Sequence, residues 1–387
     1  MVSMKAILVL LHCESNTGYA IGPLERTFFD MALALCADDV TRVHFAYPSM
    51  KRGPSHTIPD TFRQYTVIDT KSPSPTHWNA AETYLRDHGI DTIFGFDQPV
   101  HLPVFRYFRR AGVKHFVSYW GAPMSSLNGW PVRLLKQVEV LCRPNGPDHY
   151  IFESNGMAEL AVKGRGIPAG RTSVVHLGVD IERFKPDHAD ARYVYEATGI
   201  PKERRVFYYS GHMEERKGVA VIMRAANYLA EHRPDRDWHI LLCGNKAMES
   251  RPHEALLSEG ARAHVTFGGY RSDTHRLQRG CYAAVIASTG WDSFPRSGLE
   301  MQASGLPIVV SNLIGLREVV EDRVTGYLFD PGNAVALANT MERLLDDPLN
   351  REQLADSARR RIQRQFTLRR QLDDLIGTMR EIVDPRE

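Results

Sequence analysis

The sequence predicts an α/β protein made of two doubly wound domains that face each other across a cleft. Short, continuous apolar segments alternate with longer amphipathic segments along most of the 387 residues, which is typical of parallel strands covered by helices on both faces. A polar, aperiodic segment at 176–192, which contains Pro186, interrupts the alternation and is the expected linker. Because ligands of doubly wound sheets bind beyond the carboxyl ends of the strands, the cleft is the expected site.

The first half of the chain accounts for one sheet and its helices. Continuous apolar runs predict strands at 4–11, 42–47, 91–96, 114–119 and 149–154. Apolar residues at helical spacing predict helices at 22–36, 77–88, 102–111, 132–142 and 155–164. We expect residues 1–184 to form the N-terminal domain.

The second half repeats the pattern. Strands are expected near 205–210, 238–243, 264–267, 282–287 and 306–310. Helices are expected near 217–232, 273–280, 296–304 and 333–346, followed by two long helices at about 350–364 and 367–382. We expect residues 185–366 to form the C-terminal domain and the last helix, in 367–387, to pack back on the first domain.

Composition and charge exclude several classes of protein. A formal net charge of +2 is too small to indicate nucleic acid or an anionic membrane as the main partner. The six arginines between Arg359 and Arg370 are expected to form the solvated face of a C-terminal helix. Five cysteines without CxxC spacing indicate buried thiols in a reducing cytoplasm and give no sign of a disulfide framework or a zinc site.

The N-terminus and the apolar runs indicate no membrane segment. The apolar stretch from Ala6 to Leu11 is short and lacks a following cleavage site, so a buried first strand is expected instead of a signal peptide. No apolar run reaches the roughly 18 residues that span a bilayer. We therefore expect a cytoplasmic protein.

Two segments of the second half carry candidate chemistry. The first, Tyr209–Gly218, follows a strand and opens a helix, where backbone N–H groups favour an anion and Lys217 and Arg216 can reach a phosphate. The second, Gly290–Val310, places Asp292 in a loop and Glu300 on the helix after it. A carboxylate that accepts hydrogen bonds from vicinal hydroxyls suits sugar or ribose recognition.

Together these segments resemble the family 4 glycosyltransferases. The family's E-x-F-G-x-x-x-x-E loop and G-x-P-V-V segment have counterparts in Asp292, Phe294, Glu300, Gly305, Pro307, Val309, Val310 and Gly315. The pair Lys217-Gly218 is similar to the family's phosphate lysine and its glycine, and His176–Asp180 resembles the N-G-V-D segment at the end of the first domain. The resemblance spans about 150–370 well and the first 150 residues weakly.

The resemblance implies a GT-B fold and a retaining transferase that uses a nucleoside-diphosphate sugar, with UDP favoured, and neither a metal nor another cofactor. It places Lys217 on the diphosphate, with Arg216 in support, and Asp292 on the donor sugar. Donor contacts are further implied for Gly18, Gly22, Gly211, His212, Tyr270, Phe294, Pro295, Arg296, Ser297 and Glu300. In the segment from Phe294 to Ser297, the backbone amides are the expected contacts.

Three positions depart from the family pattern. His212 stands where an arginine usually accompanies the phosphate lysine, and Asp292 is one methylene shorter than the usual glutamate. Trp120 stands where many members have a histidine that contacts the donor sugar, and an indole cannot act as a base. These departures leave open a non-catalytic nucleotide-sugar binder, besides a sugar-nucleotide epimerase or a phosphorylase on the same fold.

Acceptor contacts are expected from the first domain. Asp97 and His101 follow the strand at 91–96 and, with Trp120, are the candidates. A small molecule and a growing glycan are both open as acceptors. The segment from Trp130 to Val138 is amphipathic and basic and could rest on a membrane. We expect instead that it forms a buried helix of the first domain.

Overall fold

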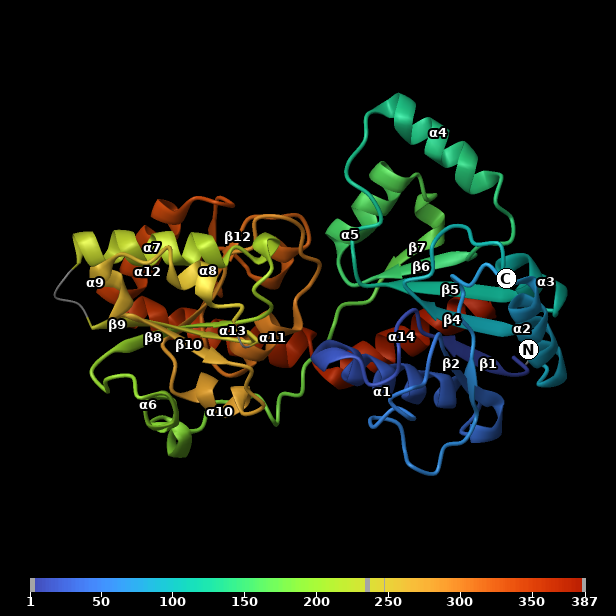
Figure 1. The fold of residues 1–387 in the computed structure, drawn as a ribbon, viewed down its shortest axis with the longest axis horizontal. Coiled ribbons are helices and arrows are strands. Elements are labelled where there is room, and N and C mark those ends of the chain that lie inside the picture. Colours follow the sequence, from blue (N-terminus) through green and yellow to red (C-terminus); the bar gives the residue numbers. More distant parts are fainter. Residues whose placement is uncertain (1–3, 234–236, 247, 385–387) are drawn as a thin grey trace. The chain divides into compact units, whose positions relative to one another are not determined.

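The computed structural model describes residues 4–233, 237–246 and 248–384. The chain divides into two compact units, which we call unit 1 (Met1–His176 and Arg369–Glu387) and unit 2 (Leu177–Leu368). Each unit contains one sheet whose strands pair in parallel, with helices around it (Figure 1). The prediction of two doubly wound domains is therefore confirmed.

Unit 1 has a seven-stranded sheet in the order β3-β2-β1-β4-β5-β6-β7. Its strands are β1 (Ile7–Leu10), β2 (Val43–Tyr47), β3 (Tyr65–Val67), β4 (Thr92–Phe96), β5 (His115–Trp120), β6 (His149–Phe152) and β7 (Thr172–Val174). Its helices are α1 (Gly18–Leu35), α2 (Pro75–Asp87), α3 (Phe105–Arg110), α4 (Trp130–Leu141), α5 (Asn155–Glu159), which continues into a π-helical turn (Leu160–Arg165), and α14 (Leu368–Val383).

Unit 2 has a six-stranded sheet in the order β10-β9-β8-β11-β12-β13. Its strands are β8 (Arg205–Ser210), β9 (Trp238–Cys243), β10 (Val265–Gly269), β11 (Ala283–Ile286), β12 (Ile308–Ser311) and β13 (Gly326–Phe329). Its helices are α6 (Tyr193–Thr198), α7 (Val219–His232), α8 (Arg251–Glu254), α9 (Glu259–Arg262), α10 (Thr274–Arg279), α11 (Arg296–Ala303), α12 (Ala334–Asp346) and α13 (Pro348–Gln365).

The strand order places a switch point in each sheet. In unit 1, β1 pairs with both β2 and β4, and in unit 2, β8 pairs with both β9 and β11. The crossovers after β1 and after β4 run in opposite directions along the sheet, as do those after β8 and after β11. The loops at the carboxyl ends of each pair therefore separate and expose a crevice position. The segments that follow β1 and β4, and those that follow β8 and β11, are therefore where each unit positions a ligand.

Three expectations about burial are wrong. Helix α4 was expected to be buried, yet of its residues only Val140 is buried. Two of the arginines expected on a solvated face bind main-chain carbonyls of unit 2: Arg359 donates to Phe184 and Ala303, and Arg361 donates to Glu318 and Val319. The five thiols are free, but Cys142 is exposed.

No helix in the described part of the chain is both long and apolar enough to cross a membrane.

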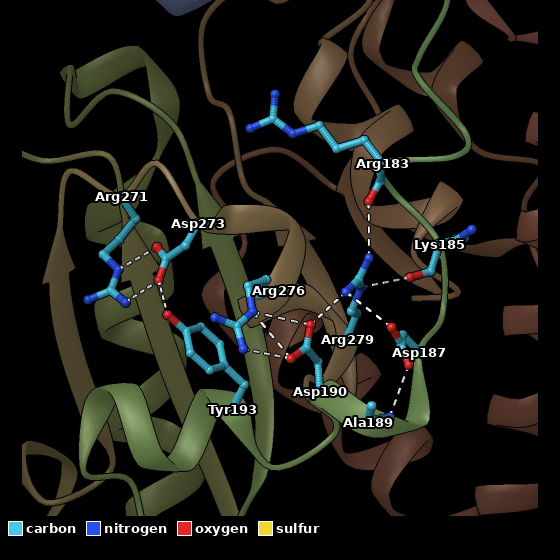
Figure 2. A network of polar contacts seen from close by, with 10 residues as sticks. All are labelled: Arg183, Lys185, Asp187, Ala189, Asp190, Tyr193, Arg271, Asp273, Arg276 and Arg279. Atoms are coloured by element: carbon cyan, nitrogen blue, oxygen red, sulfur yellow. Dashed lines mark hydrogen bonds and ion pairs between the residues drawn. The ribbon is translucent and has the colours of Figure 1, made fainter.

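A network of ion pairs fixes the first residues of unit 2 to α10 (Figure 2). Asp190 accepts hydrogen bonds from Arg276 at 2.8 Å and Arg279 at 2.6 Å. The guanidinium of Arg276 also lies 3.7 Å from the ring centroid of Tyr193, whose hydroxyl donates to Asp273. The hydrogen bonds from Arg276, followed by those from Arg279, lower the pKa of Asp190 from 3.8 to about 2.

This network predicts a pH-dependent contribution to stability. Because the pKa of Asp190 is lowered in the folded state, its contribution is present above the ordinary value of 3.8 and is lost as the pH falls towards about 2. Asp190→Asn should lower the free energy of unfolding in urea at pH 7 by up to about 1 kcal/mol, the range of solvent-screened pairs. The difference from wild type should shrink between pH 4 and pH 2.

Asp187→Asn is the matched control, because Asp187 is more exposed and its contact with Arg279 is 3.4 Å long. A loss for Asp190→Asn that stays constant across this pH range would contradict the assignment.

Candidate functional site

The loops after β8 and β11 meet at the switch point of unit 2. A one-turn 3-10 helix (Glu215–Lys217) follows β8, and Gly218 then starts α7 with φ of +69°. A Cβ at Gly218 would lie 1.7 Å from the carbonyl oxygen of Ala287, so no other residue permits this approach. The amide of Thr289 donates to the Arg216 carbonyl at 2.8 Å and fixes the second loop on the first.

Lys217 and Asp292 form an ion pair where these loops meet. The Lys217 Nζ lies 2.8 Å from Oδ2 of Asp292, and the side chains are 16% and 6% exposed. Ser288, which is buried just after β11, donates to the same carboxylate oxygen at 2.9 Å. Sequence analysis predicted both charged residues as site residues, but it did not predict that they bind each other.

Arg216 is engaged within the loops of this site. Its Nε lies 2.7 Å from the carboxylate of Glu214, its Nη1 donates to the carbonyl of Trp291 at 3.1 Å, and its guanidinium lies 4.0 Å from the Trp291 ring centroid. A stacked and paired arginine braces one loop against the other. Arg216 would have to leave these partners to reach a phosphate.

The other residues at this edge of the sheet that were expected to contact the donor substrate, Gly211, His212 and Tyr270, differ in their exposure to solvent. The amide of Gly211 donates to the Cys243 carbonyl at 3.1 Å, so it serves the sheet. His212 is exposed, and its carbonyl accepts from the Tyr209 hydroxyl at 2.6 Å. Tyr270 follows β10 and is exposed, so its ring is accessible to a flat ligand group.

Helix α11 carries the remaining predicted residues of unit 2. Phe294 is fully buried against Phe366, and Pro295 precedes the helix. The expectation of backbone amides throughout this segment is wrong at Pro295, because proline has no N–H group. Ser297 is half-buried in the first turn, and Glu300 is buried in the second turn.

Arg296 begins α11 as a buried cation. Its Nη1 donates to the carbonyl of Gly178 at 2.8 Å. Its Nη2 is also buried and has no hydrogen-bond partner among the described residues. A buried guanidinium N–H without a partner is costly, so this position favours an acceptor such as a phosphate oxygen.

A second cluster lies at the switch point of unit 1. Asp97 directly follows β4, has φ of +52°, and accepts a hydrogen bond from the Gly121 amide at 2.9 Å. His12 follows β1, and its Nδ1 is 3.7 Å from Oδ2 of Asp97. Burial raises the pKa of Asp97, while His12 and the Gly121 amide act in the opposite direction. A carboxylate that stands on a strained backbone and lies beside a histidine is typical of a functional position.

The other two acceptor-side candidates, Trp120 and His101, have no described side-chain contact with Asp97. Trp120 ends β5 and is half-buried, and its Nε1 has no hydrogen-bond partner among the described residues. His101 is mostly exposed. Its pKa is lowered first by the loss of some solvent around the ring and then by the positive charge of Arg143. No described contact joins His101 to Asp97.

The expected glycine loop of unit 1 is the start of a helix. Gly18 is the first residue of α1 and has φ of +71°. Gly22 lies in the second turn of α1, where a Cβ would be 2.9 Å from a methyl group of Thr57. Packing within unit 1 therefore accounts for the glycine at position 22.

Sequence analysis missed His12, Ser288 and Trp291. His12 is the second residue after β1, and Asp97 is the first residue after β4, so the same positional signal could have identified His12. The roles of Ser288 and Trp291 depend on side-chain contacts that no spacing reveals. In the described part of the chain, no three or more His, Cys, Asp or Glu side chains form a group that could hold a metal ion.

Comparisons with known proteins agree with this architecture. Residues 194–361 match the family described as "Glycosyl transferases group 1". A D-inositol 3-phosphate glycosyltransferase of Corynebacterium diphtheriae is 30% identical over 192 residues, which cover 48% of this chain and 45% of that protein. The UDP-Gal:alpha-D-GlcNAc-diphosphoundecaprenol alpha-1,3-galactosyltransferase of Escherichia coli is 24% identical, with 49% of each chain covered. The chain thus spans about half the length of these relatives.

Solved structures resemble the whole chain. A glycosyltransferase from Rickettsia africae has a TM-score of 0.79 at 16% identity, with 99% of this chain and 100% of that chain covered. HepE of Anabaena, solved in complex with UDP, has a TM-score of 0.76 at 18% identity, with 97% and 99% covered. These similarities establish the GT-B fold.

The pair of Lys217 and Asp292 predicts a non-additive effect on stability. Lys217→Ala leaves a buried carboxylate without its cation and should lower the free energy of unfolding by roughly 1–3 kcal/mol. Adding Asp292→Asn removes the stranded charge and should restore part of this loss. Urea unfolding of wild type, both single variants and the double variant measures the coupling. Additive losses would show that the two side chains do not interact.

Proposed function

We propose, from the match of residues 194–361 to the group 1 glycosyl transferases, that the chain is a retaining glycosyltransferase. It moves a sugar from a nucleoside-diphosphate sugar to a hydroxyl group of a small molecule or a growing glycan. Unit 2 binds the donor, and the polar cluster of unit 1 contacts the acceptor.

The observation that carries this proposal is the position of Lys217. Its ammonium group lies at the switch point of unit 2, next to the first turn of α7, and the buried Asp292 holds it there. N–H groups of a helix start and a fixed cation together favour a diphosphate. The buried Nη2 of Arg296 at the start of α11 offers a further donor.

The remaining donor contacts follow from the carboxylates. Glu300 accepts hydrogen bonds from the ribose hydroxyls, and Asp292 contacts the donor sugar with the oxygen that does not hold Lys217. Tyr270 lies beside the base. UDP is favoured as the nucleotide, because the Escherichia coli relative is named for UDP-Gal and HepE was solved with UDP and with UDP-glucose.

The proposed reaction needs neither a protein nucleophile nor a metal. The bond between the anomeric carbon and the diphosphate oxygen breaks while the acceptor oxygen bonds to the same face of that carbon. The acceptor proton passes to the departing diphosphate. Lys217 and Arg296 stabilise the negative charge that grows on this leaving group, which is where preorganised donors lower a barrier most.

A ligand screen followed by a transfer assay tests this function. UDP and UDP-sugars should raise the melting temperature, because a ligand at a hundred times its Kd stabilises a protein by about 2.7 kcal/mol. Lys217→Met should reduce sugar transfer by about 10²-fold, as for the loss of one oxyanion donor. Lys202→Met, at an exposed lysine of the same unit, is the matched control and should keep normal turnover.

The outcomes separate the alternatives. Normal transfer by Lys217→Met would contradict the assignment of the site. Consumption of the nucleotide sugar without any acceptor would indicate an epimerase, and binding without transfer to any acceptor would indicate a binding protein.

The Asp97 cluster predicts an acid limb in the pH profile. Burial raises the pKa of Asp97 above its ordinary value of 3.8. If its carboxylate takes part in the reaction, activity should therefore fall as the pH drops through this raised pKa. The variant Asp97→Asn is suitable because asparagine also adopts the left-handed backbone conformation. It should lower kcat/KM for the acceptor about 10- to 100-fold and leave donor affinity unchanged. An unchanged acid limb in this variant would exclude Asp97 from acceptor chemistry.

A further inference from the structure

Helix α4 presents its apolar side to solvent. Among its large apolar residues, Trp130, Leu135 and Leu141 are 72%, 71% and 69% exposed. Val132, Leu134 and Val138 are also exposed. A surface helix normally turns such residues towards the core, so this orientation requires a partner that unit 1 itself does not supply.

The exposed residues form one stripe, which we call the α4 stripe: Trp130, Leu134, Leu135, Val138 and Leu141. The spacing of three, four and seven residues keeps them on one side of the helix. Cys142, at the end of the helix, is also exposed. The stripe thus runs along the full length of α4.

The opposite side of α4 holds the helix to unit 1. A Cβ at Gly166 would lie 2.7 Å from the backbone nitrogen of Gln137, so the helix contacts the segment after α5 closely. Lys136 donates to Ser125 at 2.8 Å, and Glu139 lies 3.2 Å from Arg165. Figure 1 shows α4 on the outer side of unit 1, beyond α5. These contacts hold the polar side of α4 against unit 1, so the α4 stripe faces away from unit 1.

Charge and size identify the occupant. Residues 130–143 contain three basic side chains and one acidic side chain, and the acidic Glu139 is paired with Arg165. This excess of cations fits an anionic surface. A 12-residue helix is about 18 Å long, so its stripe covers a few hundred Å² at most, whereas a stable protein interface takes about 800 Å² from each partner. A bilayer surface requires no such area or shape complementarity.

We infer that α4 docks the chain on an anionic lipid bilayer, with the α4 stripe inserted at the boundary between headgroups and acyl chains. Trp130 and the leucines enter the interface, and Arg133 and Arg143 lie at the phosphate level, as in interfacial amphipathic helices. The docking does not rest on the proposed function. Its consequence does: a transferase held in this way would act on an acceptor that is anchored in the membrane.

Flotation of the full chain with vesicles tests the docking. Wild type should float with vesicles of phosphatidylcholine and phosphatidylglycerol, and the bound fraction should fall at least about fivefold without the anionic lipid, since each cation near the surface contributes about that factor. Leu134→Gln with Leu141→Gln should lower binding at least about tenfold. Val335→Gln with Leu349→Gln changes two exposed apolar residues of unit 2 and should leave binding unchanged.

Cys142 gives a second readout in the same preparation. It is the exposed cysteine among the described residues, so a thiol-reactive, polarity-sensitive fluorophore labels the edge of the α4 stripe. Its emission should shift to shorter wavelength when anionic vesicles are added. Far-UV circular dichroism and the urea unfolding midpoint should be the same in all variants, which shows that they are folded.

The docking is wrong if wild type does not float, or if the variant without Leu134 and Leu141 floats equally well. It is also wrong if sedimentation shows a dimer that this variant abolishes while vesicles leave the fluorophore unchanged, because the stripe would then bind a second copy of the chain.

Discussion

The ion pair between Lys217 and Asp292 is the interaction on which the candidate site depends. It joins the start of α7 to the loop after β11, and Ser288 fixes the same carboxylate oxygen from the end of the strand. The close approach of Gly218 to Ala287 brings the two loops into register. The ammonium group of Lys217 has three N–H donors, and the Asp292 carboxylate accepts from one of them. The other donors can bind the oxygens of a diphosphate.

Much of the fold could be predicted because the central strands are continuous apolar runs. The strands at 205–210 and 238–243 were predicted with the bounds that the structure has. The edge strands β3, β7 and β13 were missed. Strands β3 and β7 are three residues long, partly exposed and lack an apolar run, and β13 is only four residues long. Amphipathic periodicity identified α4 but could not give the direction of its apolar side, because that direction is set by contacts with Gly166 and Arg165.

The site was predictable in its charges but not in its contacts. Sequence placed Lys217, Arg216, Asp292 and Arg296 at loop and helix starts, and the structure has them there. Their partners come from distant segments: Arg216 stacks on Trp291, and Arg296 binds the carbonyl of Gly178. No spacing encodes such pairings. His12 and Asp97 are a pair that strand order does predict. Strands β1 and β4 are neighbours in the sheet, so the residues after their carboxyl ends lie close together.

The two units use the same device, in which polar residues follow the strands on either side of a switch point. The central claim is that the switch point of unit 2 binds a diphosphate. A crystal structure of the chain with UDP tests it most directly. We expect a phosphate oxygen at about 2.8 Å from the Lys217 Nζ, with α7 and α11 starting beside the diphosphate. Phosphates bound elsewhere, with Lys217 contacting only Asp292, would contradict the account.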